Sequence, residues 1–103
     1  MSFPKSDPIW NYSNPSIASK RAKQLYNLKL YRSETKNKKY YIITPDNKKV
    51  NFGAMGYEDY TKHKDDNRKE SYIKRASKIK GDWMNNEYSP NNLAMHILWN
   101  LNK

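Results

Sequence analysis

A histidine among carboxylic acids is the first group in this sequence whose residue types could do chemistry. His63 lies in the stretch NFGAMGYEDYTKHKDD (51–66), four residues after Asp59 and just before Asp65 and Asp66. A histidine with carboxylates can hold a divalent metal ion that cuts phosphodiesters, so a metal-dependent nuclease using His63 and Asp65 is one hypothesis. The spacing matches no established metal-ligand motif, and no second histidine is close. We therefore favour the alternative, in which an aspartate caps a helix and His63 is a loop residue bonded to the backbone.

The other groups that could do chemistry are weaker candidates. His96 lies in the apolar stretch LAMHILW and is predicted to be a core histidine with satisfied hydrogen bonds. The glycine pair Gly53 and Gly56 is too sparse for a phosphate-binding loop and instead lets the chain leave a strand and reverse. The absence of cysteine excludes disulfides and thiolate metal sites. We predict no catalytic residue, no metal site and no cofactor.

Tyrosines interleaved with lysines point to a different chemistry, the binding of nucleic acid. The stretch KKYYIITPDNKK (38–49) places Tyr40 and Tyr41 between two lysine pairs. Strand alternation sends the two rings to opposite faces, so one is expected outside the core, where Tyr41 could stack on unpaired bases. The alternative is an outward tyrosine that only supports the sheet. The lysines could hold phosphates, which gives salt-dependent and sequence-tolerant binding.

The distribution of charge supports an anionic partner. The net charge is +10, and residues 20–50 carry ten Lys and Arg against two acids, whereas residues 54–103 carry nine against seven. Such clustering is not needed for solubility alone. The alternative is a solvated basic surface that reflects AT-rich coding. The predicted nucleic-acid-binding residues are Lys20, Arg21, Lys23, Lys38, Lys39, Tyr41, Lys48, Lys49, Arg68, Arg75 and Lys78.

The elements that must position these groups form a small α+β domain. β-Branched and aromatic residues around a turn predict an antiparallel hairpin over 39–53. Residues 28–34 are either a third strand or an irregular lead into the hairpin. Helical spacing of apolar residues predicts helices near 15–27, 66–79 and 90–101, the second of them with a basic face.

Length and composition set the domain organisation. With 103 residues, the chain is expected to form an extended N-terminal arm over 1–13 and one domain over 14–103. The C-terminal helix is apolar nearly all round, which predicts either a central core element or an oligomer interface. No run approaches the ~18 apolar residues of a membrane span, and the N-terminus lacks the apolar run of a signal peptide. We expect no membrane association and no secretion.

Two-thirds of the chain, from KKYYIITPDNKKVNFGAMGYEDYTKHKDD to YSPNNLAMHILWN, resembles a family of small basic proteins encoded by nucleocytoplasmic large DNA viruses, the giant and algal viruses among them. The residues that carry the resemblance are Lys38, Lys39, Phe52, Gly53, Gly56, Tyr57, Asp59, Thr61, His63, Asp65, Arg68, Tyr72, Arg75, Trp83, Leu98 and Trp99. The resemblance implies a viral protein located in the virion or in the viral factory of the host cytoplasm. It implies no activity.

These observations predict a non-enzymatic, largely sequence-independent nucleic-acid-binding protein, with DNA favoured over RNA and with an association to the packaged genome. The alternative is a minor virion structural or assembly protein. It would act through contacts with other virion proteins, or with itself through the C-terminal apolar helix.

Overall fold

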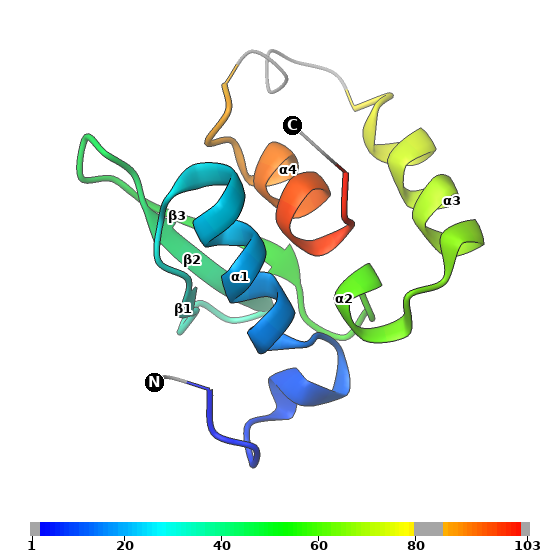
Figure 1. Ribbon diagram of the computed structural model, residues 1–103, viewed down its shortest axis with the longest axis horizontal. Coiled ribbons are helices and arrows are strands. Elements are labelled where there is room, and N and C mark those ends of the chain that lie inside the picture. The colour runs from blue at the N-terminus through cyan, green and yellow to red at the C-terminus, as the bar shows by residue number, and fades with distance from the viewer. Residues whose placement is uncertain (1–2, 80–85, 102–103) are drawn as a thin grey trace.

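The strand pattern KKYYII forms the middle of a three-stranded antiparallel sheet in the computed structural model (Figure 1), which describes residues 3–79 and 86–101. In chain order the elements are η1 (Pro8–Asn11), α1 (Pro15–Tyr26), β1 (Tyr31–Arg32), β2 (Lys38–Ile43), β3 (Lys49–Ala54), α2 (Tyr60–His63), α3 (Asp66–Ala76), α4 (Pro90–Leu93) and η3 (Ala94–Leu98). The element η1 is a 3-10 helix, and η3 is a π-helical continuation of α4. The predicted small α+β fold is confirmed.

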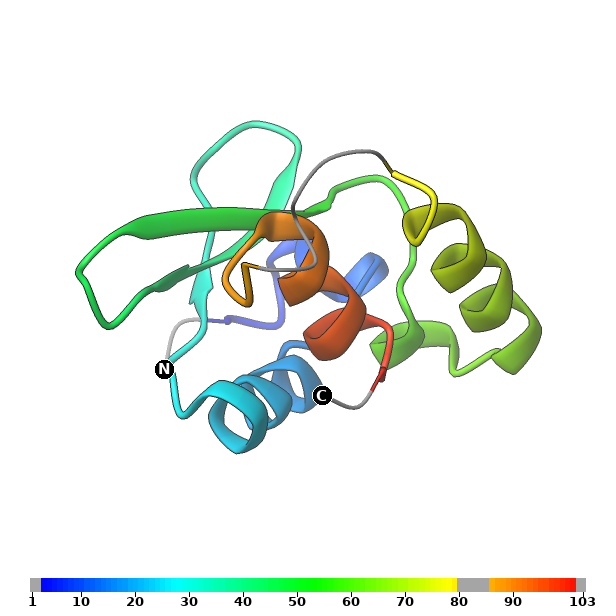
Figure 2. The same cartoon turned by 90° about the horizontal axis from the view of Figure 1, so that it is seen from above.

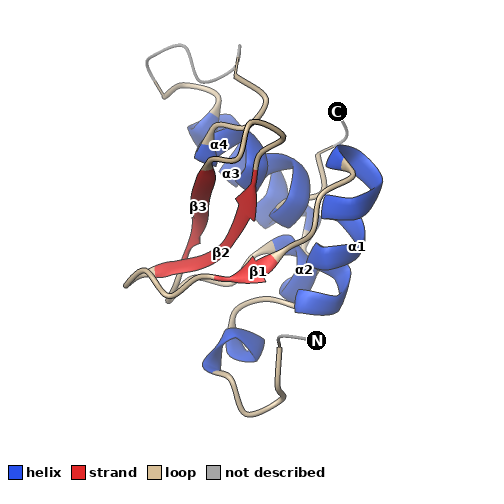
Figure 3. Ribbon diagram, turned by 90° about the vertical axis from the view of Figure 1, so that its left-hand side faces the viewer, coloured by secondary structure: helices blue, strands red, loops and turns tan. Residues whose placement is uncertain are grey.

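The sheet has the strand order β1-β2-β3, and its register follows the expected alternation. Tyr40 lies opposite Phe52 and Ile42 opposite Val50 across the hairpin, and the first three of these side chains are fully buried. The helices lie on one side of the sheet (Figure 3), so these residues face them and the intervening residues face away. Residues 28–34 do supply a third strand, but it is only Tyr31–Arg32.

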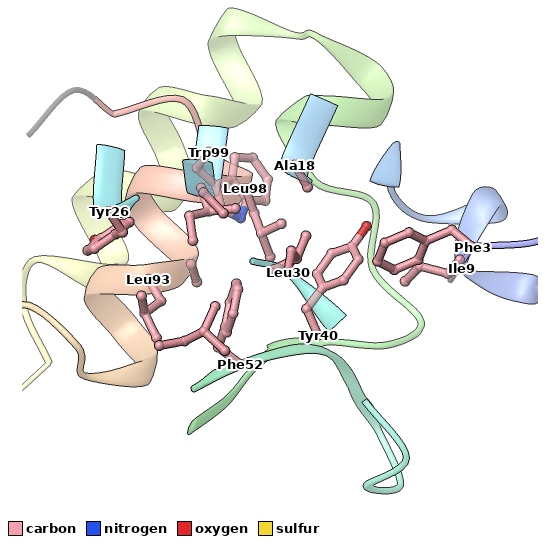
Figure 4. Close-up of a cluster of buried hydrophobic side chains, with 14 residues drawn as sticks. Phe3, Ile9, Ala18, Tyr26, Leu30, Tyr40, Phe52, Leu93, Leu98 and Trp99 are labelled. Carbon is pink, nitrogen blue, oxygen red and sulfur yellow. The ribbon is translucent and has the colours of Figure 1, made fainter. Parts of the chain in front are cut away.

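The core lies between the sheet and the helices (Figure 4). Tyr40 and Phe52 from the sheet meet Leu93 and Leu98 from the C-terminal helical segment, and all four are at most 1% exposed. Full burial of a side chain of this size contributes about 1.5–3 kcal/mol. Of the two predicted roles of the C-terminal segment, a central core element or an oligomer interface, the monomer shows the first, because the apolar side chains of this segment are buried in the core.

Capping residues fix where the helices begin. The side chains of Asn14, Asp65 and Ser89 accept hydrogen bonds from the first backbone N–H groups of α1, α3 and α4. Asn14 and Ser89 stand in the sequence where caps are expected, and of the two aspartates that could cap the helix after His63 it is Asp65 that does so. The helix α3 ends at Ala76 rather than at residue 79. From the sequence we also expect Lys80-Gly81 to end this helix and Trp83 to anchor the loop that follows, but these residues lie outside the described part of the chain.

Two predictions about local structure are wrong. Residues 3–13 are not an extended arm, because the chain turns through η1. Attachment of this segment to the core through Ile9-Trp10 or Tyr12 was expected from the sequence, and Ile9 is completely buried. The stretch before α3 is not only a loop, because Asp59 caps the short helix α2. A helix of one turn is too short for an apolar repeat to reveal it. Figure 2 shows η1 and α2 below the sheet, next to the helical layer.

Candidate nucleic-acid interface

The fold separates the predicted nucleic-acid-binding residues into three regions. The exposed Lys20 and Lys23 lie on α1, within the helical layer on the far side of the core from the open sheet face (Figure 3). The hairpin carries the predicted residues of segment 38–49, and α3 carries those of segment 68–78. The predicted residues therefore do not form one continuous basic surface.

The open face of the sheet carries a cross-strand pair of tyrosines. Tyr31 on β1 lies opposite Tyr41 on β2, and their rings stack with centroids 4.9 Å apart and planes 14° apart. The ammonium group of Lys49 on β3 lies 4.3 Å from the centre of the Tyr41 ring, and that of Lys29 lies 5.9 Å from the centre of the Tyr31 ring. Because β2 lies between its two neighbours, Tyr31 and Lys49 approach Tyr41 from opposite sides. We call Lys29, Tyr31, Tyr41 and Lys49 the tyrosine–lysine ladder.

Two of the four residues of the ladder were predicted from the sequence. Tyr41 and Lys49 were predicted to bind nucleic acid, whereas Tyr31 and Lys29 were not. The alternation in LKLYRSE already put Lys29 and Tyr31 on one side of their strand. What it could not show is the register that brings Tyr31 opposite Tyr41.

Lys39 is not available to nucleic acid, so this part of the prediction is wrong. The residue is 2% exposed, and its ammonium nitrogen lies 2.9 Å from a carboxylate oxygen of Asp59, which is fully buried. Burial lowers the pKa of Lys39, and the charge and hydrogen bond of Asp59 oppose this effect. The physical reason for the burial is the chain segment after β3, which returns over this end of the hairpin and supplies the carboxylate.

Asp59 also anchors a buried network of hydroxyl groups. Its second oxygen accepts hydrogen bonds from the backbone N–H and the hydroxyl of Thr61. The Thr61 hydroxyl lies 3.1 Å from that of Ser13, which also accepts a 2.7 Å hydrogen bond from Tyr40. Burial raises the pKa of the Tyr40 phenol. The network joins the N-terminal segment, the sheet and α2, and it satisfies polar groups that would otherwise be costly to bury.

Two other predicted cations have partners within the chain. Arg21 is half-buried and donates to the backbone carbonyls of His96 and Leu101, so it holds the C-terminal segment. Lys48 lies 3.6 Å from the carboxylate of Asp46, but both side chains are mostly exposed and water screens such a pair. Arg21 thus already has partners within the chain, and nucleic-acid binding by Arg21 stays a prediction, while Lys48 is accessible, as is the exposed Lys38.

The α3 region forms one wall of a pocket with a volume of about 510 Å³. Arg68 and Arg75 line this pocket together with Lys39, another of the predicted nucleic-acid-binding residues. Arg68 forms a 3.1 Å ion pair with Glu58. Lys78 is exposed, lies beyond the end of the helix and is not among the lining residues.

The surroundings of His63 fit the structural alternative rather than the nuclease. Its Nδ1 accepts a 2.9 Å hydrogen bond from the backbone N–H of Asp65, as the prediction of a backbone-bonded histidine requires. Its Nε2 is buried without a hydrogen-bond partner, and its ring centre lies 5.2 Å from that of Trp99. Burial, helped by the charge of Arg68, lowers the pKa of His63. Within residues 3–79 and 86–101, no three His, Asp or Glu side chains gather in a way that could hold a metal ion.

Comparison with known proteins adds little about function. Residues 28–76, slightly less than half of the chain, match the profile of a family of unknown function (DUF5754). That range runs from the lead into β1 to the end of α3, so the chain is similar to this family over the whole sheet and the helices α2 and α3. No curated protein and no solved structure matches the chain. In the part of the chain that the structure describes, no helix is long and apolar enough to cross a membrane.

Proposed function

We propose that this protein binds single-stranded nucleic acid without enzymatic activity, and that the open face of its sheet is the binding surface. The tyrosine–lysine ladder is the observation that carries this proposal. A ring on an exposed sheet face can stack on any unpaired base, because every base has a π-face. An ammonium group next to each ring can neutralise the adjacent phosphate.

The geometry of the ladder supports an exchange of partners on binding. In the free protein the ammonium of Lys49 lies over the ring of Tyr41. An incoming base can take this place on the ring, while the ammonium moves to the phosphate of the same nucleotide. Exposed cation–π contacts are worth only about 0.5–1 kcal/mol, so little is lost in the exchange. Neither Lys29 nor Lys49 forms an ion pair with a carboxylate of the described chain.

The expected binding is tolerant of base sequence, because the ladder offers rings and charges rather than a set of hydrogen bonds to base edges. Lys38 and Lys48 on the same hairpin add charge that any polyanion can use. The resemblance to proteins of large DNA viruses makes DNA the first ligand to test, and association with a packaged genome is the role that would follow.

The test is a titration of a fluorescent single-stranded oligothymidylate with purified protein, followed by anisotropy at about 50 mM and about 200 mM salt. We expect affinity to fall steeply with salt, and Tyr41→Ala to cost about 1–3 kcal/mol of binding free energy. Folding of the variant is checked by circular dichroism. Equal affinity for wild type and Tyr41→Ala, or no binding at the lower salt concentration, would overturn the proposal.

A further inference from the structure

The pocket beside α3 is lined by a stacked pair of aromatic rings and has a tightly packed floor. The rings of Tyr72 and Trp99 stack in parallel, with centroids 4.2 Å apart and planes 4° apart, and both line the pocket. Leu98 lines it from the core side, where a Cβ atom on Gly53 would come within 2.8 Å of the Leu98 Cδ1. A volume of about 510 Å³ is within the range of ligand sites in proteins.

An exposed tyrosine adds to the lining of this pocket. The side chain of Tyr57 is among its lining residues and is 73% exposed, although tyrosines of this protein are otherwise mostly covered. It follows Gly56, whose φ of +93° is readily adopted by glycine. The exposed ring of Tyr57 and the half-buried ring of Tyr72 in one pocket lining favour a flat, partly apolar ligand.

The charges of the pocket favour an anion. Lys39 lines it but is already compensated by Asp59. Arg75 is exposed and has no ion pair in the described chain, whereas Arg68 pairs with Glu58, which also lines the pocket. The two arginines are seven positions apart on one helix, so they lie on the same face and about 10 Å apart along the axis. A phosphate group would be able to bind Arg75 and compete with Glu58 for Arg68, because guanidinium groups bind phosphate bidentately.

We propose that this pocket binds a nucleotide. The base lies against the Tyr72 ring, which Trp99 supports by stacking, with Tyr57 on its open side, and the phosphate lies on Arg75 and Arg68. The same chemistry fits a free mononucleotide and one nucleotide unit of a single strand. The site is separate from the tyrosine–lysine ladder, because no ladder residue lines the pocket, and it stands whether or not the ladder binds nucleic acid.

The experiment is a calorimetric titration of the full chain with adenosine monophosphate, adenosine and inorganic phosphate in turn. We expect the monophosphate to bind at least tenfold more tightly than either part alone. Arg75→Glu is expected to weaken its binding at least tenfold. The matched control Lys74→Glu makes the same charge change on the same helix at an exposed residue outside the pocket, and is expected to change affinity less than threefold. Ser71→Trp, at an exposed position of the lining, is expected to block the pocket.

Several results would overturn the proposal: equal effects of Arg75→Glu and Lys74→Glu, no effect of Ser71→Trp, or benzoate binding as tightly as the monophosphate. A short oligoadenylate distinguishes the two sources of the ligand. If Arg75→Glu also weakens binding of the oligoadenylate, the pocket binds one nucleotide unit of a strand. If it does not, the pocket binds the free nucleotide. Tyr41→Ala separates this site from the ladder, because it should leave binding of the monophosphate unchanged even if the ladder proposal fails.

Discussion

The two ends of the β2–β3 hairpin use the same residue types in opposite ways. At one end Lys39 is buried and paired with Asp59, and Gly53 packs beneath Leu98. At the other end Lys49 is exposed and lies over the ring of Tyr41. The difference comes from the segment that follows β3, which covers the first end and leaves the second open. A lysine near a strand tyrosine therefore has a structural role where another segment packs over it, and is a candidate binding group where it stays exposed.

The buried pair gives the largest expected effect. Asp59→Ala leaves the charge of Lys39 buried without a partner and removes the cap of α2, so we expect a loss of about 3–5 kcal/mol in the free energy of unfolding. Chemical denaturation measures this loss. Asp46→Ala is the control, because Asp46 pairs with Lys48 at the exposed turn, and it should cost less than about 1 kcal/mol. Similar losses for both variants would contradict the distinction between the two ends.

Two glycines at the covered end of the hairpin, Gly53 within β3 and Gly56 just after it, sharpen the comparison. Gly53 and Gly56 both have positive φ, of 81° and 93°, which costs an alanine about 1–2 kcal/mol. Only Gly53 also has a close neighbour, because its added Cβ would meet Leu98 Cδ1 at 2.8 Å. Such overpacking adds about 1–3 kcal/mol. We expect Gly53→Ala to lower the free energy of unfolding more than Gly56→Ala does, as measured by thermal or chemical denaturation. A larger loss for Gly56→Ala would show that the covered end is loosely packed.

The smallest expected effect is a dependence of stability on pH. The folded pKa of His63 is below its value in the unfolded chain, so the unfolded state binds more protons and stability rises with pH. The charged groups that act on it are Arg68, Asp59, Glu58 and Asp65. Its contribution is fully present above about pH 6.5 and is lost as the pH falls towards the lowered folded value. Between pH 7.5 and pH 5 we expect wild type to lose more stability than His63→Gln, as measured by denaturation at each pH. Parallel losses would show that His63 does not contribute.

Features that depend on residues close together in the sequence were predictable, and features that depend on distant residues were not. The caps Asn14, Asp65 and Ser89 were predictable, because a cap bonds to backbone only two or three residues away. The hairpin was predictable because turn residues separate two alternating segments. By contrast, the burial of Lys39 depends on Asp59, twenty residues further along the chain.

The candidate sites were less predictable for the same reason. The alternation of residues along the hairpin is enough to identify Tyr41 and Lys49 as outward-facing. The ladder also depends on the register between β1 and β2, which places Tyr31 opposite Tyr41. The pocket needs the contact between Trp99, directly after η3, and Tyr72 on α3, two residues that are far apart along the chain. Periodicity identifies the face of an element, and it does not identify the element that the face meets.

The most direct test of the proposed function compares two lysines that sequence reasoning treated alike. Lys49→Glu and Lys20→Glu change the net charge equally, but Lys49 belongs to the ladder and Lys20 lies on α1. The measurement is the affinity for a single-stranded oligothymidylate as a function of salt concentration. We predict that Lys49→Glu weakens binding at least tenfold and makes the salt dependence shallower, while Lys20→Glu has an effect several times smaller. Equal losses for the two variants would contradict the account, because binding would then follow net charge rather than the open face of the sheet.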